Sequence, residues 1–227
     1  MSATAAAERS AVLLVEFQNQ WTLRGSYHRL IRGQLTSRKV VANTKALVSA
    51  ARRVGVAVIH APLIVDPARK KGWLAHLTFG KVFTRGTWKS NITDGLLAEG
   101  DHVVHDRYAF DAFRGTDLEV MLRRLSVEHL FVCGFTTDQC VSRTLRTALD
   151  LGFDTHLVSD CTATLNGWLQ RRAERRFGPR VIKHEDLLPA FTATSVREGG
   201  GVATAARPSA QPAEHRVLRG RHEREAW

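Results

Sequence analysis

The stretch HLFVCGFTTDQCVSRTLRTALDLGFDTHLVSD, residues 129–160 of a chain of 227, decides the fold class. It starts with a run of apolar, strand-forming residues at 129–135 and ends with a second such run at 154–160. Between them, residues 138–152 have the apolar periodicity of a helix, and Gly152 provides a stop signal. Two apolar strands joined by a helix predict a βαβ unit, whose strands are parallel and covered on both faces.

The rest of the chain continues this alternation of strands and helices. Further strands are predicted at residues 11–17, 56–62, 102–108 and 181–184, and further helices at 43–55, 117–125 and 168–177. We therefore expect an α/β fold, a doubly wound parallel sheet with helices on both faces, in a single domain over residues 1–198.

Two segments fall outside this pattern. Residues 64–100 have weak periodicity, which favours a pocket wall or a subunit contact over regular structure. Residues 199–227 are rich in Gly, Ala, Pro and charge, and they predict a flexible basic tail.

Composition excludes several classes of protein. Apolar residues make up 44% and charged residues 24%, which is ordinary globular usage and excludes wholesale disorder. The formal charge of +11 raises a polyanion as partner, but Lys and Arg are scattered, so we expect no nucleic-acid partner. No apolar run is long enough for a membrane span and no basic leader opens the chain, so we expect a cytoplasmic protein. Three cysteines without a CxxC pair argue against a disulfide scaffold and against zinc.

Candidate chemistry follows from where the strands end. In an open parallel sheet, ligands bind outside the carboxyl ends of the strands. Glu16 closes the first predicted strand, Arg107 lies near the end of the third, and Cys140 follows the fourth. A carboxylate, a guanidinium and a thiol should therefore meet at one edge.

Cys140 has two readings. A thiol in the first turn of a helix, capped by Thr137 or Asp138, feels the positive end of the helix dipole, which favours a nucleophilic thiolate. It could equally be a small buried hydrophobe. Cys133 fits the core, and Cys161, after the fifth strand, is left open.

Glu16 also has two readings. A carboxylate at the end of an apolar strand is costly unless it is paired or faces water. It could be a structural ion pair, or a base that accepts the thiol proton. Arg107 is permanently charged, so it can hold Glu16 in place but cannot exchange protons.

Three motifs resemble those of one family. The segment 134–153, GFTTDQCVSRTLRTALDLGF, resembles the nucleophile turn of the isochorismatase-like cysteine hydrolases. The segments VLLVEFQNQW at 12–21 and HVVHDRYAFDAFRGTDLEVML at 102–122 resemble two further motifs, and VIHAP and RGTW are also similar. The resemblance covers residues 11–188. The family includes nicotinamidases, N-carbamoylsarcosine amidohydrolases and ureidoacrylate and biuret amidohydrolases.

The resemblance implies roles for individual residues. It implies a triad of Glu16, Arg107 and Cys140, with Glu16 where the family motif has Asp and Arg107 where it has Lys. It implies an oxyanion hole from the backbone N–H groups of Thr136 and Cys140, shaped by a cis peptide between Phe135 and Thr136. The expected substrate pocket contains Gln18, Trp21, His60, Trp88, Phe110 and Phe135.

The expected function is hydrolysis of a small amide, imide or ureido C–N bond through a thioester on Cys140. The alternatives are vinyl-ether hydrolysis of the isochorismatase type and a non-catalytic binding protein that retains the fold. We expect no cofactor and no metal, because His60 stands alone and no D-x-H follows it. The resemblance further implies a homodimer or homotetramer.

Overall fold

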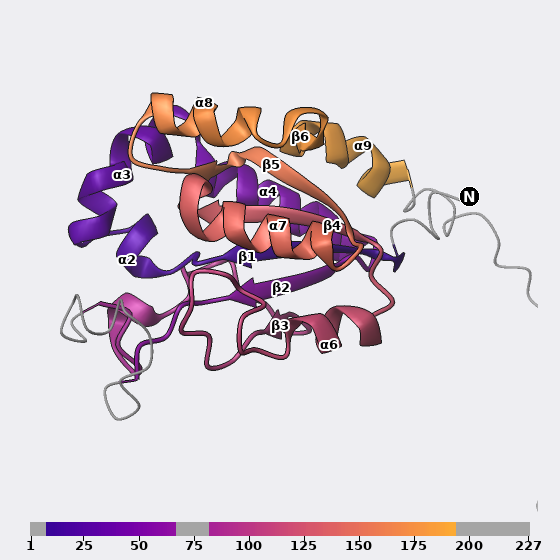
Figure 1. The fold of residues 1–227 in the computed structure, drawn as a ribbon, viewed down its shortest axis with the longest axis horizontal. Helices are drawn as coiled ribbons and strands as arrows, with labels where there is room; N and C mark the ends of the chain where they lie inside the picture. The colour runs from indigo at the N-terminus through magenta and orange to yellow at the C-terminus, as the bar shows by residue number, and fades with distance from the viewer. Residues whose placement is uncertain (1–7, 67–81, 194–227) are drawn as a thin grey trace, which may run out of the picture.

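The computed structural model describes residues 8–66 and 82–193, which surround one parallel sheet of six strands (Figure 1). The strands are β1 (Ser10–Val15), β2 (Ala57–Ala61), β3 (His102–Val103), β4 (His129–Phe135), β5 (Asp154–Ala163) and β6 (Val181–Ile182). Their order across the sheet is β3-β2-β1-β4-β5-β6, and every neighbouring pair is parallel. The predicted α/β class is confirmed. The predicted tail at 199–227 lies outside the described residues.

Helices cover both faces of the sheet. They are α2 (Asn19–Thr22), α3 (Ser26–Ser37), α4 (Val40–Arg53), α6 (Leu118–Arg124), α7 (Ser142–Asp150), α8 (Gly167–Arg175) and α9 (His184–Ala193), with the short helices η1 (Trp88–Ser90), η2 (Thr137–Val141) and η3 (Gly178–Arg180). Because side chains alternate along a strand, Leu14 of β1 packs in the core shared with α3, α4 and α9. Its neighbour Leu13 packs in the second core, with α6 and α7. In Figure 1, α7 lies in front of the sheet and α4 behind it.

The third strand is shorter than predicted. It was expected at residues 102–108 but ends at Val103. The backbone of Asp106 has φ 54°, a left-handed conformation that interrupts an extended chain. The chain nevertheless stays beside the end of β2, since the Ile64 N–H donates to the Arg107 carbonyl at 2.8 Å. Arg107, the next residue, is fully buried.

The fifth strand is longer than predicted because it contains a bulge. Val132 of β4 pairs with Leu157, but Gly134 pairs with Thr162, so the register shifts between them. Residues 158–161 of β5 thus occupy the place opposite the single residue Cys133 of β4. The strand therefore continues to Ala163 instead of ending at Asp160.

The order of the strands fixes where a site can lie. Successive strands run outward in one direction from β1 to β3 and in the other from β4 to β6. Between β1 and β4 the direction reverses, and loops at the carboxyl ends of these two strands diverge to leave a crevice. Residues that follow β1 and β4 therefore line one cavity.

Among the described residues, none of the helices has the length and hydropathy needed to cross a lipid bilayer.

Candidate active site

Glu16 is the first residue after β1, and its carboxylate is held inside the protein. Its φ of 60° is uncommon for a residue with a side chain and turns the chain sharply at the strand end. The residue is 1% exposed. Oε1 accepts from Nη2 of Arg107 at 2.8 Å, and Oε2 accepts from the indole N–H of Trp21 at 3.0 Å. Two charge-assisted hydrogen bonds thus fix both oxygens, with lone pairs left for another donor.

Arg107 reaches the same point from the loop after β3 and is fully buried. Besides Glu16, its guanidinium donates to the carbonyl of Ala61 at 2.7 Å and to that of Phe110 at 2.6 Å. The planar fork therefore joins the end of β2, the loop after Arg107 and the Glu16 carboxylate.

Cys140 is delivered by the turn after β4. Gly134 has φ 129°, and a Cβ there would lie 1.9 Å from the carbonyl oxygen of Val15, so β1 and β4 approach this closely only with glycine. The peptide bond between Phe135 and Thr136 is cis. Thr136 occupies the N-cap position of η2 without a side-chain cap, so the expectation of Thr137 or Asp138 as cap was wrong. Instead, Thr137 donates to Gln170 and Asp138 accepts from Thr164.

The surroundings of Cys140 favour the protonated thiol. Burial raises its pKa well above the ordinary value, the nearby Glu16 carboxylate raises it further, and a hydrogen bond with Glu16 adds to this. The Arg107 charge and the Thr136 backbone N–H act in the opposite direction but do not reverse the shift. The helix start acts in the expected direction, since the Thr136 N–H lowers the pKa of Cys140, but burial and the Glu16 carboxylate outweigh it. The sulfur lies beside a carboxylate placed to accept its proton.

Glu16, Thr136 and Cys140 open into a cavity of about 920 Å³. It is lined by Glu16, Trp21, Tyr27, Leu30, Leu63, Phe83, Tyr108, Ala109, Phe110, Asp111, Arg114, Thr136, Asp138, Gln139, Cys140, Arg143, Thr164 and Leu165. The walls are largely apolar and aromatic, and the volume is in the range of small-molecule sites. Of the predicted pocket residues, Trp21 and Phe110 belong to this lining.

Four predicted pocket residues lie outside the lining and have structural contacts instead. The amide of the buried Gln18 bonds the Leu63 carbonyl at 3.0 Å and the Ser90 carbonyl at 2.8 Å. Phe135 is fully buried and packs on Trp21, with ring centroids 5.9 Å apart. Trp88 lies on the surface, 4.5 Å beneath the guanidinium of Arg24.

His60 is the fourth of these residues. Its side chain leaves β2 on the face covered by α4, where Nε2 lies 2.9 Å from Asp101. Arg52 of α4 binds the same carboxylate through two nitrogens, at 3.0 and 2.6 Å. The position of His60 at the end of a strand predicted the correct edge of the sheet. It did not predict the face, because successive side chains of a strand point in opposite directions.

Several residues that line the cavity were not predicted from the sequence. Tyr27 of α3 stacks on Trp21 with centroids 4.7 Å apart, and Tyr27 and Phe83 stack at 5.6 Å. Tyr27 lines the cavity together with Glu16 and Cys140. Burial raises the pKa of Tyr27, and the charges of Glu16 and of an ionised Cys140 raise it further. Cys161, which the sequence left open, is buried in the core next to Cys133. Within residues 8–66 and 82–193, no three His, Cys, Asp or Glu side chains lie close enough together to hold a metal ion.

Comparisons with known proteins agree with this geometry. The family model described as the isochorismatase domain matches residues 10–185. A curated relative, the ureidoacrylate amidohydrolase RutB of Serratia proteamaculans (strain 568), is 27% identical over 179 residues, which are 69% of this chain and 71% of the relative.

Solved structures share the fold. A cysteine hydrolase from Pseudomonas syringae pv. phaseolicola 1448A has a TM-score of 0.73 at 21% identity, covering 83% of this chain and 94% of its own. The nicotinamidase/pyrazinamidase PncA of Bacillus subtilis has a TM-score of 0.62 at 21% identity, with coverage of 77% and 100%. The family model spans most of the chain, and the chain therefore belongs to the isochorismatase family of hydrolases.

Proposed function

We propose that this hydrolase cleaves a C–N bond of a small amide, imide or ureido compound through a thioester on Cys140. One observation carries the proposal: the Cys140 thiol and the Glu16 carboxylate line the same cavity, and the buried Arg107 guanidinium holds that carboxylate at 2.8 Å. The name of the relative, a ureidoacrylate amidohydrolase, supports the same class of bond.

The mechanism follows from the hydrogen bonds. Glu16 accepts the thiol proton as the Cys140 sulfur attacks the substrate carbonyl, which spares the enzyme a free thiolate at rest. The backbone N–H groups of Thr136 and Cys140 stabilise the oxyanion, and the Thr136 N–H already points to the sulfur. Protonated Glu16 then returns its proton to the leaving nitrogen, and the C–N bond breaks. Water, activated by Glu16, hydrolyses the thioester to the acid and restores the thiol.

The cavity suggests which substrates fit. The stacked rings of Trp21, Tyr27 and Phe83 favour a flat or apolar group beside the scissile bond. Arg114 and Arg143 also line the cavity, and among the described residues neither guanidinium has a carboxylate partner within 4 Å. Their positive charge favours substrates that carry an anionic group.

The test is a panel of small primary amides, ureido acids and cyclic imides, with ammonia release as the assay. We expect turnover by wild type, its loss in Cys140→Ala, and acid-stable acylation of Cys140 by mass spectrometry. Cys133→Ala is the matched control, since Cys133 is equally buried but lies outside the cavity. Turnover that survives Cys140→Ala would contradict the thioester and favour acid-catalysed ether hydrolysis. A wild type that binds panel compounds without hydrolysing them would favour a binding protein.

A further inference from the structure

Thr137 links the nucleophile turn to α8. It is the first residue of η2, directly after Thr136 and three residues before Cys140. Its hydroxyl donates to Oε1 of Gln170 at 2.8 Å, and both residues are fully buried. Its carbonyl accepts from the hydroxyl of Ser142 at 2.5 Å. A displacement of Thr137 would therefore move the Thr136 N–H and the Cys140 sulfur together.

The turn itself depends on support from outside. Helix η2 is a single π-turn, in which the Val141 N–H donates to the Thr136 carbonyl at 3.2 Å. Such wide turns are rare and concentrate at functional sites. Since no side chain caps this helix, the contact between Thr137 and Gln170 supplies a side-chain anchor from a separate element.

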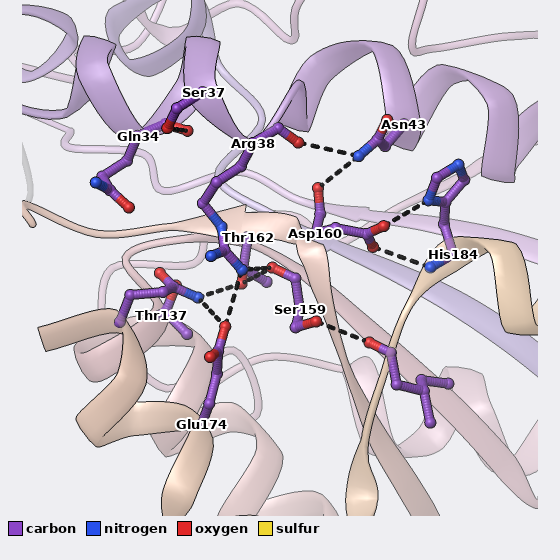
Figure 2. A network of polar contacts seen from close by, with 12 residues as sticks. Gln34, Ser37, Arg38, Asn43, Thr137, Ser159, Asp160, Thr162, Glu174 and His184 are labelled. Carbon is purple, nitrogen blue, oxygen red and sulfur yellow. Dashed lines mark hydrogen bonds and ion pairs between the residues drawn. The ribbon is translucent and has the colours of Figure 1, made fainter. Parts of the chain in front are cut away.

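Gln170 is in turn held by a closed ring of polar groups. Its Nε2 donates to Glu174 at 2.9 Å and to the hydroxyl of Thr162 at 3.2 Å. Nη2 of Arg38 donates to the same Glu174 oxygen at 2.8 Å and to the Ser159 carbonyl at 2.7 Å. The Thr162 hydroxyl closes the ring on Ser159 at 2.9 Å. Figure 2 shows Arg38, Glu174, Ser159 and Thr162 converging at one point between α3, α8 and the bulge of β5.

The ring fixes which way the Gln170 amide points. A carboxylate only accepts hydrogen bonds, so the NH₂ group of Gln170 must face Glu174. The amide oxygen then faces Thr137, and the Thr137 hydroxyl must act as donor. The reverse orientation would place the amide oxygen against the Glu174 carboxylate, two acceptors without a hydrogen between them. The bulge that carries Ser159 is also fixed from its other side, where Asp160 accepts from the backbone N–H of His184 at 2.9 Å (Figure 2).

We propose that Gln170 is a positioning residue for the hydrolysis, oriented by the Arg38–Glu174 ion pair and acting on Cys140 through Thr137. The inference rests on the proposed function, but it concerns residues that line no part of the cavity. The alternative is a purely structural role, in which the ring of polar groups only holds α8 against β5. The two readings differ in what a lost contact does to the thiol.

The experiment compares Gln170→Met, Thr137→Val and Thr137→Ser for kcat, KM and the rate at which iodoacetamide alkylates Cys140. Gln170→Met and Thr137→Val should each lower kcat and alkylation about 10- to 100-fold, as small misplacements of reacting groups do, with KM within about twofold. Thr137→Ser keeps the hydroxyl and should restore both to within about threefold of wild type. Because both changes remove the hydrogen bond between Thr137 and Gln170, the double variant should be no worse than Gln170→Met alone.

Asn166→Ala is the matched control. Asn166 caps α8 by accepting the Leu169 N–H at 2.9 Å, so its loss weakens α8 without touching Thr137. We expect wild-type kcat and alkylation in this variant. If Asn166→Ala reproduces the loss, or if Thr137→Val reacts like wild type, the positioning role is refuted. Alkylation needs no substrate, so these outcomes remain separate from a failure of the amidase proposal, which Cys140→Ala decides. Should Gln170→Met fail to fold, the Thr137 pair still gives the answer.

Discussion

Replacing Glu16 with Gln should move catalysis and thiol reactivity in opposite directions. In wild type, the Glu16 carboxylate raises the pKa of the Cys140 thiol by its charge and by its hydrogen bond. A charge-assisted hydrogen bond contributes about 1.5–3 kcal/mol. Losing this bond should therefore lower the pKa of Cys140 and, at about 1.4 kcal/mol per tenfold, raise the thiolate fraction about 10- to 100-fold. In the variant, the Arg107 charge would face the sulfur without an opposing carboxylate.

The assay is alkylation by iodoacetamide at pH 7.5, with the Cys140 peptide quantified by mass spectrometry. Since the thiolate is the nucleophile, Glu16→Gln should label about 10- to 100-fold faster than wild type. Amidase activity should fall by about 10²-fold or more, because the proton acceptor and donor is gone.

The matched control is Asp111→Asn. Asp111 also lines the cavity, but its carboxylate accepts from Thr147 at 2.9 Å and is not among the groups that shift Cys140. Its labelling rate should stay within about threefold of wild type. Labelling of a folded Glu16→Gln variant that is unchanged or slower than wild type would refute the inference that the Glu16 carboxylate raises the pKa of the Cys140 thiol. The amidase assay tests Glu16 as proton acceptor, and full activity in this variant would refute that role.

Three further predictions concern buried polar side chains. Arg107→Met removes the cationic partner of the Glu16 carboxylate and should lower the free energy of unfolding by about 3–5 kcal/mol, measured by urea titration. Adding Glu16→Gln should recover at least half of this loss, and strictly additive losses would contradict the pairing. Trp21→Phe keeps the ring but removes one donor to Glu16, so kcat/KM should fall about tenfold or more, and an unchanged value would exclude Trp21 from orienting the base. Burial lowers the pKa of His60, so the unfolded chain binds a proton at higher pH than the folded one. Stability should therefore fall as pH drops below about 6.5, by up to about 1.4 kcal/mol per pH unit, which urea midpoints at pH 7.5 and 5.5 check. His60→Asn should make this slope shallower, and an unchanged slope would exclude His60 as its source.

The sequence predicted the parts of the fold whose residues are buried on every side. β4 has the predicted boundaries, because a strand covered on both faces needs an unbroken apolar run. Helix α3 was not predicted, since only Ile31 and Leu35 are buried in it and Gly33 interrupts its pattern. Its existence depends on packing against the sheet, which local propensity does not encode.

The site was predictable to the extent that topology alone determines it. The rule that ligands lie beyond the carboxyl ends of parallel strands placed Glu16, Arg107 and Cys140 together. It could not supply the bond from Trp21 to Glu16 or the stacking of Tyr27, because these depend on the rotamers of residues in separate elements. The net shift in the pKa of the Cys140 thiol was not predictable for a related reason. The helix dipole is visible in sequence, whereas burial and the sign of the neighbouring charge are properties of the folded site.

Glu16 and Arg107 are better understood as one unit than as two conservative replacements of Asp and Lys. The longer acid reaches both Trp21 and Arg107 while staying beside Cys140. The guanidinium holds it through one nitrogen and binds the Ala61 carbonyl through the other, a span that the single nitrogen of Lys cannot cover. Shortening the acid alone would withdraw the carboxylate from one of its three neighbours, and replacing Arg alone would leave a buried carbonyl without a donor. The geometry therefore couples the two positions, so that the identity of the acid constrains which cation can hold it.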